Sequence, residues 1–181
     1  EMCIRDSNSF KEARFLRAYF YFNLVRAYGD VPYFTEMVTT DQVNSLTRTP
    51  AQEIFNAIIA ECDKLSTELP ADYTKLGLDG IAPAENGRVT CYAALALKAR
   101  AALYAASPLF NPENNKDLWR RAAEANKEVI ETCTANGFKL SKYSELWGPN
   151  NWSNNEMIFV RRYNGNISTL EEYNFPMGVP G

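Results

Sequence analysis

Aromatic side chains that lie outside any helical pattern are the residues of this sequence best suited to bind a ligand. After Leu140 the helical spacing of apolar residues disappears, and aromatic residues are mixed with amide and guanidinium groups. Flat aromatic faces offer apolar surface on which a ligand can stack, and amide and guanidinium groups donate hydrogen bonds to its polar groups. Packing of the same residues against the helices is the alternative. The candidate ligand-binding residues are Trp147, Trp152, Asn154, Arg161, Tyr163, Asn164 and Tyr173.

Catalytic chemistry has little support in the sequence. The chain contains no histidine, so the commonest general base and metal ligand is missing. A glycoside hydrolase needs two positioned carboxylates. Glu171 and Glu172 are adjacent, so their side chains point apart in most conformations, and Glu156 has no evident partner. We therefore predict no catalytic residue and no enzyme activity.

The cysteines give no sign of a metal site. Cys62, Cys91 and Cys133 are far apart in the sequence, odd in number and without a CxxC motif, which argues against zinc and against a disulfide framework. Each follows a helical pattern among small or apolar residues, as expected of small buried side chains. We predict no metal and no cofactor.

The composition is that of a soluble globular domain. The chain has 181 residues, 46% of them hydrophobic and 23% charged, which is enough for one domain with its own core. The net charge of -3 gives no indication of nucleic-acid binding. No apolar run approaches the ~18 residues that a membrane span requires.

Several segments have the apolar spacing of α-helices. Thr49 is predicted to be the N-cap of the second helix, with Pro50 in its first turn and Gln52 completing a capping box. Gly29 is expected to end the first helix, and Gly137 the last. The apolar stripe of the first helix is so wide that we expect this helix to pack on more than one side. The predicted helices span residues 11–28, 50–69, 90–106 and 117–134.

The last two predicted helices form an antiparallel hairpin of the size of one tetratricopeptide unit. The buried face of the last helix is predicted to consist of Trp119, Ala122, Ala123, Asn126, Val129, Ile130 and Cys133. Downstream, residues 157–161 have a strand-like pattern. The sequence thus predicts an all-α fold of tetratricopeptide-like helix pairs, followed by an irregular, loop-rich segment.

The first seven residues, EMCIRDS, match no targeting signal. They lack the basic start and the apolar run of a secretory signal, and no apolar stretch precedes Cys3 as lipid attachment would require. Reverse translation of this segment can give a string that resembles the transposon end used to prepare sequencing libraries. We therefore interpret residues 1–7 as a translated adapter. Because GVPG also ends abruptly, we expect the natural chain to extend beyond both ends of the sequence.

Blocks of sequence in a fixed order resemble the SusD/RagB family. They are EARFLRAYFYFNLVRAYGDVPYFTE, RTPAQEIFNAIIAECDKL, GRVTCYAALALKARAALYAASPLFN and NNEMIFVRRYN. The resemblance extends over about residues 9–181 and implies tetratricopeptide-like helix pairs that carry a loop-rich binding part. Residues 8–143 would then form the helical-repeat region, and residues 144–181 the truncated start of the ligand-binding region.

The same resemblance implies a function. It suggests a lipid-anchored protein on the outer membrane surface of a Bacteroidota-type bacterium, which captures glycan, or peptide in RagB-type members. The protein would act as a lid on a SusC-type TonB-dependent transporter and would not be an enzyme. The signal peptide and lipid-bearing Cys of the family are absent from this sequence. A helical-repeat scaffold that binds a partner protein is the alternative.

Overall fold

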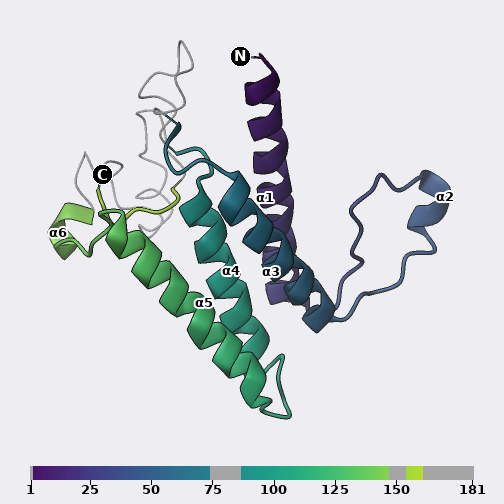
Figure 1. Ribbon diagram of the computed structural model, residues 1–181. Helices are drawn as coiled ribbons and strands as arrows, with labels where there is room; N and C mark the ends of the chain where they lie inside the picture. The colour runs from purple at the N-terminus through teal and green to yellow at the C-terminus, as the bar shows by residue number, and fades with distance from the viewer. Residues whose placement is uncertain (1, 74–86, 147–153, 161–181) are drawn as a thin grey trace, which may run out of the picture.

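The structure, a computed structural model, describes residues 2–73, 87–146 and 154–160, with side chains from Ser7 onward. Long helices α1, α3, α4 and α5 lie side by side in this order, and the short helices α2 and α6 lie outside them (Figure 1). The all-α prediction is confirmed, since the only β-pairing among the described residues is a bridge between Val31 and Thr49. The helices are α1 (Met2–Tyr28), α2 (Thr40–Val43), α3 (Ala51–Glu68), α4 (Cys91–Ala106), α5 (Lys116–Ala135) and α6 (Tyr143–Leu146).

Helix α1 begins earlier than the sequence predicted. The predicted start near Lys11 is wrong, because the helix already begins at Met2. No proline or glycine precedes Lys11, so nothing in the backbone stops the helix from continuing toward the N-terminus. The helix ends as predicted at Gly29, whose φ of 70° is a left-handed conformation that favours glycine. The interpretation of residues 1–7 as a translated adapter stays a prediction.

Helix α3 is capped by a residue distant in sequence. The backbone N–H of Ala51 donates to Oδ1 of Asp30 at 2.8 Å, and the bridge between Val31 and Thr49 brings Asp30 to this helix start. The predicted N-cap at Thr49 is therefore wrong. The predicted capping box is also wrong, because Gln52 donates through Nε2 to carbonyl oxygens beyond its own helix.

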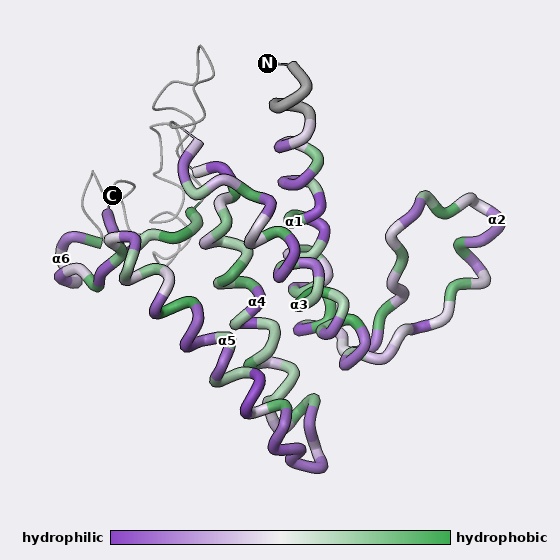
Figure 2. The backbone as a smooth tube through the Cα atoms, viewed as in Figure 1, coloured by the Kyte–Doolittle hydropathy of each residue, from purple (hydrophilic) through white to green (hydrophobic). Residues whose placement is uncertain are grey.

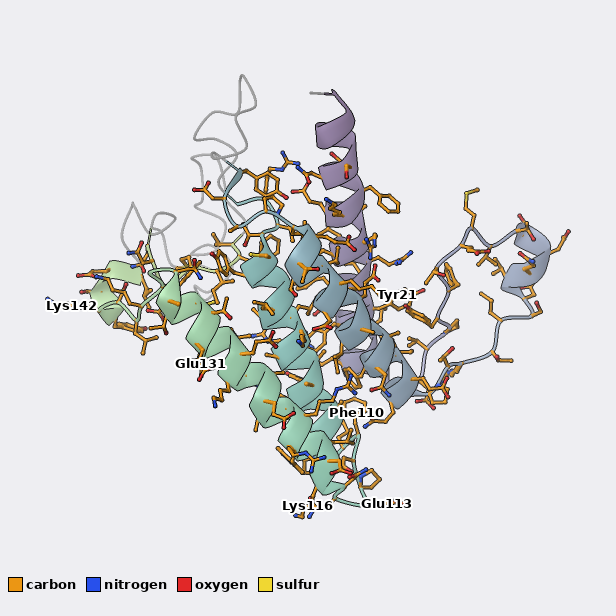
Figure 3. All side chains as sticks on the ribbon, viewed as in Figure 1. Tyr21, Phe110, Glu113, Lys116, Glu131 and Lys142 are labelled. Atoms are coloured by element: carbon orange, nitrogen blue, oxygen red, sulfur yellow. The ribbon has the colours of Figure 1, made fainter. Side chains whose placement is uncertain are left out.

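The side chain of Gln52 ties α3 to the end of α4. Its Nε2 atom lies 2.7 Å from the carbonyl oxygens of both Ala105 and Phe110. The last carbonyls of a helix have no partner within the helix, so a side chain from a neighbouring helix satisfies them here. Figure 3 shows Phe110, with Glu113 and Lys116, at the turn that joins α4 to α5.

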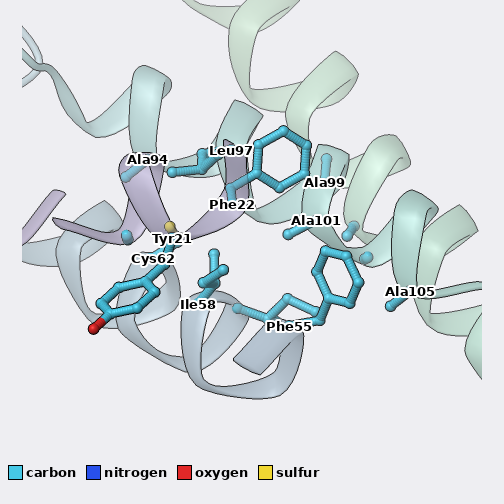
Figure 4. Packing of buried hydrophobic residues seen from close by; sticks show 14 of the residues in the cluster. Tyr21, Phe22, Phe55, Ile58, Cys62, Ala94, Leu97, Ala99, Ala101 and Ala105 are labelled. Atoms are coloured by element: carbon cyan, nitrogen blue, oxygen red, sulfur yellow. The ribbon is translucent and has the colours of Figure 1, made fainter. Parts of the chain in front are cut away.

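The core lies between α3 and the helices on either side of it. The apolar stripe of α3 faces phenylalanines of α1 and alanines of α4, and Figure 4 shows this packing around Phe22, Phe55 and Ile58. Small alanine side chains let helices approach closely, so the large residues of α1 and α3 fill the space between them. The largest fully buried side chains are Phe15, Phe22, Val25, Ile54, Phe55, Ile58, Cys62 and Leu65.

Helix α5 buries only part of the face that was predicted: Ala122, Asn126, Val129 and Cys133 are buried or half-buried, as predicted. Trp119 and Ile130 are 37% and 65% exposed, and Ala123 is also exposed, so these positions of the predicted face are wrong. Figure 2 shows that α4 is apolar or weakly polar along most of its length, whereas α5 alternates between hydrophobic and hydrophilic residues. Contact with the alanines of α4 selects the stripe of α5 with the smaller side chains. Its buried or half-buried apolar residues are Leu118, Ala122, Ala125, Val129 and Cys133.

Candidate functional site

A hollow of about 390 Å³ lies where the end of α3, the start of α4 and the end of α5 meet. Four separate parts of the chain form its wall, and aromatic side chains line it together with a guanidinium group. This is the combination of flat apolar faces and donors that carbohydrate recognition uses. The wall includes Ala71, Asp72, Tyr73, Gly87, Arg88, Thr90, Tyr92, Phe138, Asn155, Met157, Ile158 and Val160.

One side of the hollow is fixed by a stack of Arg88 on Tyr73. The guanidinium carbon of Arg88 lies 4.3 Å from the ring centroid of Tyr73, and the Tyr73 hydroxyl donates to the carbonyl oxygen of Val89 at 2.8 Å. Two nitrogens of Arg88 also donate to the carboxylate of Glu12 on α1, at 2.9 and 2.7 Å. A bidentate pair of this kind fixes the plane of the guanidinium. The stack is therefore held in place before any ligand arrives.

Another part of the wall is an aromatic pair between α4 and the residues that follow α5. The rings of Tyr92 and Phe138 are 4.9 Å apart at an interplanar angle of 62°. Phe138 reaches this position because its N–H donates to the carbonyl of Cys133 at 3.0 Å, after Gly137 has turned the chain with a φ of 86°. Burial raises the pKa of Tyr92, so its phenol is neutral at physiological pH.

A further part of the wall comes from residues 155–160. Oδ1 of Asn154 accepts hydrogen bonds from the Ser141 hydroxyl at 2.6 Å and from the Glu156 N–H at 2.9 Å. The carboxylate of Glu156 in turn accepts from the Ser141 N–H at 2.8 Å. Both side chains therefore hold this segment against the residues that follow α5. The strand predicted in this region is wrong for residues 157–160, none of which is in a strand, and residues 158 and 159 form a bend.

Of the predicted ligand-binding residues, the structure describes Asn154. Its amide oxygen makes two internal hydrogen bonds, and it lies directly before the stretch that lines the hollow. Its role in ligand binding stays a prediction. The other candidates lie outside the described residues: Trp147, Trp152, Arg161, Tyr163, Asn164 and Tyr173.

Sequence reasoning missed the residues that line the described hollow. Tyr92 lies within the predicted helix 90–106, and Phe138 directly follows Gly137, the predicted end of the last helix, but neither position indicated a binding role. Arg88 directly follows Asn86-Gly87, a dipeptide typical of turns. This pattern indicates a loop, but it does not indicate where the guanidinium of Arg88 points. No local pattern indicated that Tyr73 and Arg88 would stack.

Residues 30–50, which include α2, form an arm that extends away from the long helices (Figure 1). A second hollow, of about 450 Å³, lies on this arm. It is lined by residues of the arm itself, and Phe34 is its one aromatic lining residue. Met37, another of its lining residues, is 99% exposed. With a single aromatic face and walls from one segment, this hollow is less suited to hold a sugar than the hollow at the helix ends.

The described residues offer little for metal or nucleophilic chemistry. They contain no cluster of three or more His, Cys, Asp or Glu side chains that could hold a metal ion. Burial raises the pKa of the Cys62 thiol to about 12, so this sulfur is neither a ligand nor a nucleophile at physiological pH. Among the helices that the structure describes, none combines the length and the apolar character needed to cross a membrane.

Comparison with known proteins identifies the family. The profile of the SusD-like family, described as starch-binding and associating with the outer membrane, matches residues 6–103. This match covers more than half of the chain, so the chain belongs to the SusD-like family. Two SusD-like proteins of Formosa agariphila are similar to it, one 25% identical over 149 residues and the other 27% identical over 162 residues.

Solved structures agree with this assignment. A SusD-like protein of Bacteroides fragilis superposes with a TM-score of 0.68 at 28% identity, covering 89% of this chain and 28% of its own. A SusD-like carbohydrate-binding protein of the same species gives a TM-score of 0.64 at 29% identity, covering 84% of this chain and 26% of its own. Surface glycan-binding protein A of Bacteroides uniformis, at 24% identity and a TM-score of 0.60, supports the fold alone and covers 82% of this chain and 29% of its own.

The comparisons also show how much of a relative this chain represents. It is matched over 82% and 87% of its own length by the two Formosa agariphila proteins, but spans only 24% and 28% of theirs. This chain thus spans about a quarter of the length of these two relatives.

Proposed function

We propose that this chain is the helical part of a glycan-binding SusD-type protein that captures substrate at the bacterial outer membrane. The match of residues 6–103 to the SusD-like family carries this proposal. The hollow at the helix ends supports it, because Tyr73, Tyr92 and Phe138 provide aromatic surface around a fixed guanidinium. A lipid anchor would hold the complete protein at the cell surface.

The proposed partner is a SusC-type TonB-dependent transporter, on which the protein acts as a substrate-capturing lid. Co-purification with the transporter from outer membranes tests this partnership. A SusD-type protein that is recovered without any transporter would contradict it. A peptide-binding role of the RagB type is tested by including oligopeptides beside the glycans in the titrations below.

Ligand binding is expected to depend on aromatic residues outside the helix pairs. We expect Trp152→Ala and Tyr163→Ala each to weaken glycan binding several-fold in a protein of the length of its relatives, because a stacked aromatic contributes about 0.5–1.5 kcal/mol beyond its buried area. Calorimetric titration against a glycan panel measures the change, with circular dichroism to confirm folding. Undiminished binding in both variants would remove these residues from the site.

The hollow itself is tested by Tyr92→Ala, with Trp119→Ala as the matched control. Both changes remove an aromatic ring from a helix of the same hairpin, but only Tyr92 lines the hollow. We expect Tyr92→Ala to weaken glycan binding several-fold and Trp119→Ala to leave it unchanged. Equal affinities in the two variants would exclude the hollow as a sugar subsite. Tyr92 is 8% exposed, so circular dichroism must show that the variant is folded.

The proposed function is binding without catalysis. The chain contains no histidine, and the carboxylate of Glu156 is engaged with the backbone of Ser141. We expect incubation with starch and other glycans to release no shorter oligosaccharide or reducing sugar. Turnover of any glycan by the purified protein would overturn this part of the proposal.

A further inference from the structure

The described wall of the hollow at the helix ends contains one cation, Arg88, and a carboxylate neutralises it. Nε and Nη2 of Arg88 donate to the two carboxylate oxygens of Glu12, at 2.9 and 2.7 Å. Glu12 belongs to α1 and does not line the hollow itself. The side chains of Arg88 and Glu12 are 25% and 17% exposed, so water screens the pair only in part. A ligand in the hollow therefore meets a guanidinium whose charge is cancelled by the carboxylate behind it.

The other described groups at the hollow are negatively charged or uncharged. Asp72 is half-buried and brings a carboxylate to the wall, and the remaining polar side chains of the wall, such as Asn155, carry no charge. Lys139 lies nearby in the sequence, but it is exposed and does not line the hollow. Together with Glu12, the described groups amount to two carboxylates and one guanidinium. The described wall thus has no excess of positive charge.

The phenol of Tyr92 shows how this wall receives a negative charge. Burial raises the pKa of Tyr92, and the carboxylate of Asp72 is among the neighbouring groups that raise it further. Both effects disfavour the phenolate, which is an anion within the wall. An acidic ligand group beside Tyr92 would meet the same unfavourable surroundings, whereas an uncharged hydroxyl would not.

Acidic and uncharged sugars make different demands on such a surface. A carboxylate or a sulfate loses strong hydration when it enters a hollow, and it needs a cation there to compensate. Because Arg88 is already paired, an acidic group would have to displace Glu12 or stay without a cationic partner. A sugar hydroxyl has a smaller demand, since it exchanges hydrogen bonds with water for hydrogen bonds with the protein.

We propose that Glu12 determines the class of ligand that the hollow accepts, because it holds Arg88 and thereby restricts the hollow to uncharged glycans. Uronic-acid and sulfated oligosaccharides would be excluded. This inference rests on the proposed function, in which the hollow is a sugar subsite. Glu12 acts through Arg88 without touching the ligand, so it is a positioning residue. Replacing its carboxylate with an amide of the same shape would leave the guanidinium with a net positive charge toward the hollow.

The test compares Glu12→Gln with Glu61→Gln in the 181-residue chain. Each substitution exchanges a carboxylate for an amide in an ion pair that involves α1, Glu12 with Arg88 and Glu61 with Arg14. Of the two arginines, only Arg88 lines the hollow. The ligands are maltohexaose, which is uncharged, and hexagalacturonate, which carries a carboxylate on each sugar. Calorimetric titration at low ionic strength measures both affinities, and circular dichroism confirms folding.

The expected results differ between the two ligands. The unmodified chain should bind maltohexaose about tenfold more tightly than hexagalacturonate. Glu12→Gln should tighten hexagalacturonate binding about five- to tenfold, as expected of a new hydrogen bond between charged groups, and should change maltohexaose binding by less than about twofold. Glu61→Gln should change neither affinity, and Glu12→Asp, which keeps the charge, should keep the preference for maltohexaose.

The Nε–H signal of Arg88 in NMR spectra gives a readout that needs no uncharged glycan. Galacturonate should shift this signal in Glu12→Gln and leave it in place in the unmodified chain. Equal shifts in the two proteins, or an unmodified chain that binds hexagalacturonate as tightly as maltohexaose, would overturn the role of Glu12. The second of these results needs no variant, so it is decisive even where a substitution unfolds the chain. Absence of maltohexaose binding, with a galacturonate shift in Glu12→Gln alone, would overturn the proposed function but not the exclusion of acidic sugars by Glu12.

Discussion

The interface between α3 and α4 differs from the outer faces of α1 and α5 in how far its side chains are exposed. The two regions contain the same kinds of apolar side chain, which are buried in the first and exposed in the second. Ile58 on α3 is 1% exposed, whereas Ile130 on α5 is 65% exposed. Phe22 on α1 is fully buried, and Phe20, two positions away, is 60% exposed. The difference arises because α4 supplies a row of alanines against which α3 closes, while no described element covers the outer faces.

Helix α1 shows how a sequence pattern can exceed the contacts in the structure. Its apolar stripe was predicted to pack on more than one side. Among the described residues it packs against α3, Tyr21 packs against Tyr33 and Phe34, and smaller contacts reach α4 and Phe159. The opposite side remains open. The apolar residues exposed there are Phe10, Leu16, Phe20, Leu24 and Tyr28. This chain spans about a quarter of the length of its curated relatives. A wide apolar stripe on α1 therefore does not imply that the described residues bury the whole stripe.

The largest expected effect separates the two regions directly. Ile58→Ala should cost roughly 2–5 kcal/mol of unfolding free energy, because it leaves a cavity in the seam between α3 and α4. The same substitution at Ile130 should change stability by less than about 0.5 kcal/mol. Urea denaturation of both variants measures the difference. Similar costs at the two positions would mean that α5 does not present its described face to solvent.

The next largest effect compares a half-buried ion pair between α1 and α3 with an exposed ion pair within α5. Arg14 donates to Glu61 and to Glu68, at 2.7 Å in each case, and its side chain is 18% exposed. Arg14→Met should cost about 1–3 kcal/mol, because it leaves the half-buried Glu61 carboxylate with only the longer contact to Arg17, at 3.7 Å. Arg120, 69% exposed beside Asp117, is the control, and Arg120→Met should cost less than about 0.5 kcal/mol. Chemical denaturation near neutral pH compares the two.

The same pair predicts a dependence on pH. The hydrogen bond from Arg14 lowers the pKa of Glu61 below its ordinary value of 4.5, although burial opposes this shift. Stability from a lowered carboxylate pKa is fully present above the unfolded-state value and is lost as the pH falls through the folded-state value. Denaturation midpoints measured from neutral to acidic pH should therefore fall less steeply in Arg14→Met than in the unmodified chain. Parallel curves would show that this pair does not contribute to acid sensitivity.

The smallest effect tests the cap that links the arm to the helices. Asp30→Ala should cost about 0.5–2 kcal/mol, because the N–H of Ala51 then loses its acceptor. Thr49→Ala should change stability by less than about 0.5 kcal/mol, since no side-chain cap from this residue reaches α3. Thermal melts of the two variants give the comparison. A larger loss at Thr49 than at Asp30 would restore the local cap that the sequence predicted.

The sequence by itself determined the elements of this protein that depend on short-range patterns. The helical spacing located α3, α4 and α5 to within a few residues, and Gly29 and Gly137 marked helix ends because both adopt a positive φ. The ordered sequence blocks also indicated the SusD-like family. These features could be predicted because backbone propensity and apolar periodicity act over a few neighbouring residues.

Only the tertiary structure decided how the elements use their side chains. Asp30 caps α3 from 21 residues away, and Gln52 reaches the carbonyls at the end of α4 instead of closing a local capping box. The buried face of α5 followed from the alanines of α4, and the hollow arose where Tyr73, Arg88, Tyr92 and Phe138 converge from separate segments. Each outcome depends on which polar or apolar group a distant segment brings within a few ångströms, and no pattern within one helix contains that information.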